Sequence, residues 1–336
     1  MRVAAAFVAS LMLGCGPVSV ADGLASYRQR VEQSLGLQGA AAAAPASVPR
    51  LPRRRERRIE VTDQRLGPFE FLAILGCPLS EVIAARNSAL GRVLEPTRRL
   101  AHELEVMAAA RDCMPTLSPE RAARLGDLIE AKEADLGAHV WNAVWLDDDL
   151  ERFLGAGPRA LIGGGDPTDA AWQIQRAAEA IEGIASGDLI DSPTLESGFA
   201  GLRDDPALGR VLRDLDSARR ELGRVASLVA PLDATRCDRG NRRLTQDFRE
   251  GYLPIQAKLA PVDRRGRELL GSLDQLYRVS ATAVDVPVAM RRFSAEVLDV
   301  EAEKGLWQGY RRSVARHAAA WNAMLDVCGL LPEARG

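Results

Sequence analysis

Apolar residues recur every three or four positions through most of the chain beyond residue 67, which is the spacing of one face of an α-helix. The longest such stripe fills 287–327 and predicts one helix of about 40 residues, some 60 Å long. A second stripe fills 80–111 and is interrupted by Pro96, a residue that kinks or divides a helix when it falls in its interior. The pattern therefore predicts a helical protein.

Start signals, in which a capping Ser or Asp stands at or just before a proline, divide this pattern into about eight helices. The predicted spans are 68–76, 80–111, 119–153, 168–186, 206–230, 241–259, 263–281 and 287–327. Long helices with one apolar stripe bury that stripe most economically against one another. We expect an all-α fold built as an elongated antiparallel bundle.

Composition supports this fold class and narrows the partners. The chain has 336 residues, of which 47% are apolar and only 5% aromatic, so it can bury a sizeable core but is poor in residues that strands prefer. Its 44 basic and 46 acidic residues give a formal net charge of -2. This balance gives no general argument for nucleic-acid binding, and we expect no nucleic-acid partner.

The N-terminus has the pattern of an export signal. A positive start, Met1–Arg2, precedes an apolar run at 3–13 that is too short to span a bilayer as a helix. Residues 1–14 are therefore predicted to be a cleaved signal peptide. The cysteine directly after Gly14 resembles the bacterial lipobox, which implies that Cys15 receives lipid, palmitate included, and becomes the mature N-terminus.

Gly16 after Cys15, in place of Asp, resembles the sorting signal for the outer membrane, so we expect the protein on the periplasmic face of that membrane. The membrane would then be a partner through the N-terminal lipid alone. The alternative is an ordinary secretory signal that happens to end near a cysteine.

Residues 15–66 are predicted to form a tether, and 67–336 the helical-bundle domain. The tether contains one short amphipathic helix at 21–37, which we expect to dock on the body, and an Ala- and Pro-rich linker at 39–52. The basic run Arg53–Arg58 that follows has two interpretations. It either rests on anionic lipid headgroups or is a solvated stretch that precedes the body.

Four cysteines remain after Cys15. An exported chain can form disulfides among Cys77, Cys113, Cys237 and Cys328, and three pairings are open. A straight helix over 80–111 would hold the first two about 45 Å apart, so they can pair only if the chain breaks near Pro96. Buried free thiols are the alternative. The spacings are not those of a zinc knuckle.

The chain offers little that is typical of an active site. None of its three histidines belongs to a metal-binding motif, and no cofactor, metal or catalytic residue is predicted. Gly137-Ala138-His139 followed by Asn142 comes within one residue of the Gly-x-His-x-x-Glu motif of imelysin-like periplasmic proteins. The glutamate is missing, and a histidine next to Trp141 is more often a packed helix residue.

One polar motif stands out from this background. Arg86-Asn87-Ser88 falls on the apolar line of 80–111 and so directs a charge and an amide toward the expected core. Such groups need partners, because burying them unpaired costs several kcal/mol. Two interpretations follow: a structural pin that fixes the register of the helices, or a polar pocket at the mouth of the bundle.

The same stretch carries a family resemblance. Cys77-Pro78-Leu79, the string from Arg86 to Val93 and the later Cys113 are similar to the bacterial family known as domain of unknown function 3080. This resemblance implies a lipid-anchored protein of a Gram-negative bacterium, from a family without an assigned activity. The resemblance thus implies a location and a helical fold, and it names no reaction.

These observations predict a lipid-anchored periplasmic protein that works as a non-enzymatic binding or scaffolding component of the envelope, with an envelope protein as its partner. One alternative is an imelysin-like ligand or metal receptor, whose pocket would join Arg86, Asn87 and His139. The other is an envelope hydrolase that uses carboxylates as its acid and base.

Overall fold

A computed structural model describes residues 19–37, 48–62, 67, 71, 74–87, 95–155, 167–185, 192–203, 205–233, 235 and 239–330. The described residues contain helices and turns, without a strand. The α-helices are α1 (Val20–Ser34), α2 (Arg54–Arg57), α4 (Pro78–Asn87), α5 (Pro96–Cys113), α6 (Pro119–Trp145), α7 (Asp148–Gly155), α8 (Pro167–Ala185), α9 (Ser192–Ala200), α10 (Ala207–Val229), α11 (Arg239–Asp247), α12 (Leu253–Ser280), α13 (Val288–Phe293) and α14 (Leu306–Val327).

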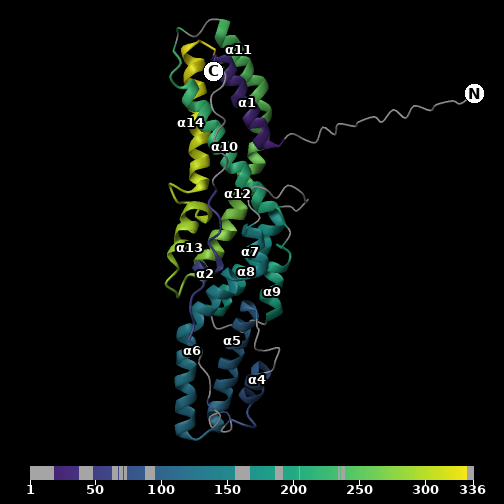
Figure 1. Ribbon diagram of the computed structural model, residues 1–336, viewed down its shortest axis with the longest axis vertical. Coiled ribbons are helices and arrows are strands. Elements are labelled where there is room, and N and C mark those ends of the chain that lie inside the picture. Colours follow the sequence, from purple (N-terminus) through teal and green to yellow (C-terminus); the bar gives the residue numbers. More distant parts are fainter. Residues whose placement is uncertain are drawn as a thin grey trace, which may run out of the picture.

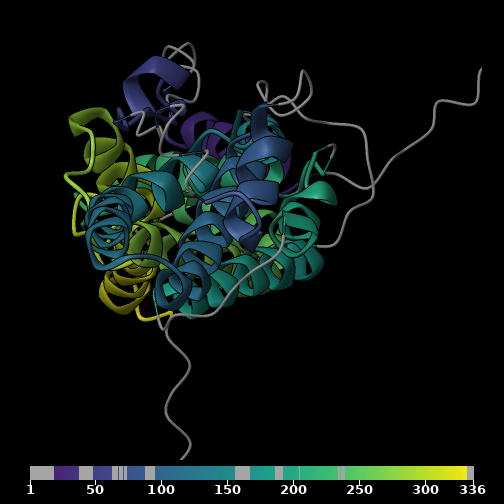
Figure 2. The ribbon, with the colours of Figure 1, turned by 90° about the horizontal axis from the view of Figure 1, so that it is seen from below.

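The helices form an elongated body (Figure 1), with α4, α5 and α6 at its lower end and α1, α10, α11 and α14 in its upper half. Most of them run along the long axis and are seen nearly end-on in Figure 2. The predicted all-α elongated bundle is confirmed. Helices α1 and α10 run parallel, because Arg28 and Glu32 on α1 meet Glu221 and Arg224 on α10 in the same order.

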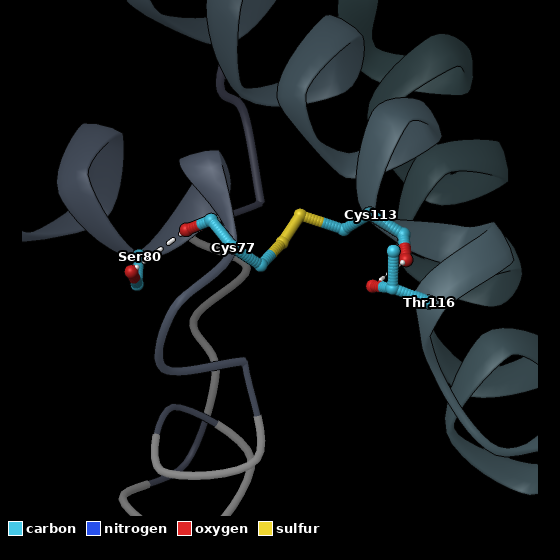
Figure 3. Close-up of a disulfide and its surroundings, with 4 residues drawn as sticks. All are labelled: Cys77, Ser80, Cys113 and Thr116. Atoms are coloured by element: carbon cyan, nitrogen blue, oxygen red, sulfur yellow. Dashed lines mark hydrogen bonds between the residues drawn. A yellow bond between two sulfur atoms is a disulfide. The ribbon is translucent and has the colours of Figure 1, made fainter.

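The break at Pro96 is confirmed, and it decides the pairing of two cysteines. Helix α4 ends at Asn87 and α5 begins at Pro96, so the chain can reverse between them. Cys77 and Cys113 are disulfide-bonded, with Cα atoms 5.8 Å apart (Figure 3). The hydroxyl of Ser80 donates to the Cys77 carbonyl, and that of Thr116 donates to the Cys113 carbonyl, each at 2.8 Å.

Three predicted spans were wrong in their boundaries. The span 119–153 is divided into α6 and α7. The spans 241–259 and 263–281 meet in one helix, α12, which continues through Pro261. A π-helical turn at Phe248–Tyr252 joins α11 to α12. The predicted span 68–76 falls mostly outside the described residues, and α9 was not predicted.

The predicted helix over 287–327 is also wrong, because a turn separates α13 and its π-helical extension Ser294–Leu298 from α14. The Asp299 carboxylate accepts the backbone N–H groups of Glu301 and Ala302, and Gly305 begins the next helix. The apolar stripe persists across the turn since both helices bury their apolar face in the same core.

The body has two apolar cores. The larger one joins α1, α5 to α8, α10 and α12 to α14, and contains Trp141, Trp145 and Trp321. The smaller one lies at the lower end between α4, α5 and α6, and includes the disulfide. A core of that size buries little apolar surface, so a covalent bond contributes a large share of its stability.

Two parts of the segment 15–66 belong to the body. Helix α1 places Leu24, Tyr27 and Val31 in the larger core, each with no exposed surface. Further along, the Asn142 side chain accepts the Ile59 N–H at 3.0 Å and donates to the Ile59 carbonyl at 2.7 Å. The chain on both sides of the Ala- and Pro-rich linker is thus fixed on the helices. No described helix has the length and apolar character required to cross a membrane.

We expect Cys113→Ala to lower the free energy of unfolding by about 3–4 kcal/mol, because the disulfide closes a loop with a sequence separation of 36 residues. Urea unfolding would measure the loss, and hydrogen exchange would locate it in α4. Ser80→Ala, which removes only a hydroxyl next to Cys77, is the matched control. Unchanged protection of the α4 amides in Cys113→Ala would contradict the assigned role of the bond.

Candidate functional site

Arg86 lies in the last turn of α4 and is partly buried. Asn87 ends the same helix, but its side chain lies outside the described residues, as does Ser88. The motif singled out in the sequence is therefore represented by Arg86. Its guanidinium is positioned to act on two groups of the neighbouring helix α5, Glu103 and His102.

Glu103 is the acidic centre of this region. Its carboxylate is paired at 2.5 Å with the ammonium of Lys132 on α6, and the two side chains are 7% and 12% exposed. Burial alone would raise the pKa of Glu103, but the hydrogen bond and charge of Lys132, followed by His139 and Arg86, hold it below its usual value. The carboxylate of Glu103 is thus ionised at neutral pH.

Two histidines flank the pair without contributing charge. Burial lowers the pKa of His102 to about 4 and that of His139 below its usual value, more than the neighbouring Glu103 can offset. Arg99 acts on His139 from α5, and its Nε is buried without a hydrogen bond. We call these residues, Arg86, Arg99, His102, Glu103, Lys132 and His139, the polar belt, because they lie where the larger core gives way to the smaller one.

The belt has more positive than negative charge. Lys132 alone is enough to balance Glu103, and among the described residues neither Arg86 nor Arg99 has a direct acidic partner at hydrogen-bonding distance. Asp135 contributes a more distant negative charge near His139. The arrangement favours an added anion over an added cation.

Two other residues of the motif around His139, Gly137 and Asn142, have structural roles. A Cβ at Gly137 would lie 2.7 Å from the Ala283 carbonyl oxygen, so glycine permits the loop after α12 to approach α6. Asn142, which stands where the imelysin-like motif has glutamate, binds the backbone of Ile59. The structure therefore brings Arg86 and His139 to the same buried pair, but it uses Asn142 elsewhere.

Two arginines of the basic run Arg53–Arg58 form ion pairs with the helical body. Arg57 is 1% exposed and its Nη2 lies 2.7 Å from Glu151, which also pairs with Arg54. The Trp141 indole N–H donates to the Arg57 carbonyl at 2.6 Å. These contacts fix Arg54 and Arg57 on the body, which neither interpretation of the run predicted, and take two arginines away from any lipid surface.

A second polar centre was missed by the sequence analysis. His317 on α14 has no exposed surface and lies among the rings of Tyr27, Tyr252 and Trp321. Its Nε2 accepts the Trp321 indole N–H at 3.1 Å and the Tyr27 hydroxyl at 2.9 Å. An indole N–H can only donate, so Nε2 carries no proton and the neutral ring is protonated at Nδ1.

The spacing of His317 and Trp321, four residues apart on a helix, was a signal that these two side chains meet. Nothing in the sequence indicated that Tyr27, 290 positions away, completes the group.

The other predicted site residues have different outcomes. Cys15 and Cys237 lie outside the described residues, whereas Cys328, like the pair of Cys77 and Cys113, is disulfide-bonded. Across the described ranges, His, Cys, Asp and Glu do not gather in groups of three or more that could hold a metal ion.

These features define a disulfide-containing, elongated all-α protein whose polar groups mainly join one helix to another. The family model for a protein of unknown function, DUF3080, matches residues 24–332, and the chain belongs to this family. Among curated proteins and solved structures, none matches the chain.

We expect the stability of the protein to fall between pH 6.5 and 4 because of His317. Burial lowers its pKa to about 4. The unfolded chain therefore binds a proton on this histidine near pH 6.5, whereas the folded chain binds it only near pH 4. The contribution of His317 to stability is therefore present in full above pH 6.5, and about 3 kcal/mol of it is lost as pH falls toward 4.

Urea unfolding at several pH values would compare the wild type with His317→Gln, which keeps an acceptor but does not titrate. Tyr27→Phe, which retains the histidine, is the control and should keep most of the pH dependence. Equal losses in the wild type and His317→Gln would contradict the assignment.

Proposed function

We propose that this protein is a lipid-anchored component of the cell envelope, exposed to the periplasm, that works by binding or bracing another envelope protein. The observation that carries the proposal is the disulfide between Cys77 and Cys113, since such bonds persist in oxidising compartments outside the cytoplasm. Together with the signal-like residues 1–14 and the cysteine that follows them, it supports export and acylation at Cys15.

The use of the buried polar groups supports binding over catalysis. Arg28, Glu32 and Glu221 form ion pairs that join α1 to α10, and Glu103 and Lys132 join α5 to α6. These groups stabilise the bundle. A catalytic acid or base would need to face a substrate.

The surface offers one feature that suits a protein partner. Trp172 on α8 is 63% exposed, and the guanidinium of Arg176 lies over its ring, 5.9 Å from the centroid. Tryptophan and arginine are the residues most enriched at the energetic centres of protein interfaces. This pair supports docking of a partner on α8.

Cys15→Ala is expected to abolish incorporation of labelled palmitate and to release the protein from the membrane fraction, because the acyl chains provide the proposed attachment. Fractionation of cells grown with the label would show both effects. Cys113→Ala is the control for a cysteine outside the signal and should keep the label. An unlabelled wild-type protein, or one that stays on the membrane after Cys15→Ala, would contradict the proposed anchor.

The polar belt favours a second candidate, a receptor for a small anion. Arg86 and Lys132 act on one buried carboxylate, Glu103, and Arg99 acts on the neighbouring His139, so a bound anion would balance the excess positive charge. This is the anionic version of the imelysin-like alternative. Its metal version lacks a cluster of ligands among the described residues, and metal analysis of the purified protein tests it directly.

We expect the purified protein to bind inorganic phosphate in titration calorimetry, and Arg86→Gln to weaken that binding by roughly 10-fold, the effect of losing one charge-assisted hydrogen bond. Arg111→Gln, on α5 and paired with the exposed Glu133, is the matched control. Absence of heat with the wild type, or equal weakening by both variants, would exclude the anion receptor.

A further inference from the structure

The position of the proposed anchor on the body is fixed by helix α1. Ser19 begins this helix: its hydroxyl oxygen accepts the backbone N–H of Asp22 at 3.1 Å. Leu24, Tyr27 and Val31 are fully buried, and Arg28 is ion-paired with Glu221 of α10 at 2.5 Å. Helix α1 is thus part of the core, and Ser19 has a defined place on its surface.

Very little chain separates this place from the proposed lipid. Cys15 and Ser19 are four residues apart, and an extended chain advances at most about 3.6 Å per residue. Whatever conformation residues 16–18 adopt, the backbone of Cys15 lies within about 14 Å of Ser19. The Ala- and Pro-rich linker follows α1 in the sequence and adds nothing to this distance.

Ser19 lies along the side of the elongated body, away from both ends. In Figure 1, α1 begins within the upper half of the body and rises toward the upper end, whereas α6 lies entirely below that start. The 15 residues of α1 extend about 22 Å, and the 27 residues of α6 about 40 Å. A body standing on either end would lift Ser19 at least about 22 Å above the membrane surface, which exceeds the reach of the chain.

We infer that the acylated protein lies with its long axis along the bilayer and with the side that bears the start of α1 against the phospholipid headgroups. This inference rests on the proposed acylation of Cys15. The partner of this side is a phospholipid surface, and the disulfide-bonded lower end and the upper end of α14 extend sideways over it. The opposite side of the body is left open to the periplasm.

The exposed side of α1 has a chemistry suited to that contact. It carries Asp22, Ser26, Gln29, Arg30 and Gln33, all exposed. These side chains are polar and their formal charges cancel, so they match the headgroup layer but would not enter the hydrocarbon. Attachment then depends on the acyl chains, and the body sets only the orientation.

Energy transfer to acceptor-labelled headgroups tests the orientation. The full mature chain, acylated at Cys15, is placed on phosphatidylethanolamine–phosphatidylglycerol vesicles. A fluorescent non-natural amino acid replaces either Arg124 at the lower end or Asn322 at the upper end, both exposed positions. We expect similar, strong transfer from both positions. Strong transfer from one end and weak transfer from the other would overturn the inference.

A spacer variant serves as the matched control. Inserting 20 Gly and Ser residues before Ser19 adds a flexible chain with an r.m.s. length of about 25 Å, which frees the body to tilt. Transfer from both positions should then fall. Unchanged transfer would show that a surface patch, and not the short connection, holds the body down, and would overturn the argument.

The chain can also be acylated chemically through the Cys15 thiol before the measurement. Failure to find lipid on the protein from cells contradicts the proposed function, whereas unequal transfer in the chemically acylated chain contradicts the orientation.

Discussion

The structure depends first on the buried ion pairs that attach α1 to α10. Arg28 lies between Glu32 of its own helix and Glu221 of α10, and all three side chains are only 8% exposed. Breaking such a pair leaves a charge buried without compensation, which costs about 3–5 kcal/mol. A shift of α1 along α10 by one turn would separate Arg28 from Glu221 and Glu32 from Arg224 at once. Helix α1 is therefore fixed in register, although it is far from α10 in the sequence.

That constraint ties the N-terminal helix to the rest of the molecule. Helix α1 also contributes Tyr27 to the aromatic group around His317. The same helix is thus joined to α10 by ion pairs and to α14 by a hydrogen bond, and it covers part of the larger core. In the smaller core, the disulfide between Cys77 and Cys113 joins the start of α4 to the end of α5. Helix α1 is thus held in place by noncovalent contacts, whereas α4 is held to the end of α5 by a covalent bond.

The sequence predicted the helical class and the division at Pro96 because periodicity and proline act locally. The predicted boundaries were wrong where the same local signal is compatible with either a continuous or a divided helix. Pro261 removes one backbone N–H, yet Leu259 and Val262 on either side are buried, and their packing keeps α12 continuous. The stripe through 287–327 survived a turn since both sides of the turn face one core. Contacts between distant segments, such as that of Asn142 with Ile59, leave no periodic signal.

The two polar centres differ in how far their charges and hydrogen bonds are used by the fold. His317 is enclosed, uncharged and bonded through Nε2 to Trp321 and Tyr27, so its chemistry is committed to the fold. Arg86 is only partly buried and adds positive charge to a carboxylate that Lys132 already balances. A positive charge without an acidic partner destabilises the folded protein, and a bound anion that neutralises it would remove this destabilisation. Of the two polar centres, the polar belt is therefore the one whose charges favour a bound anion.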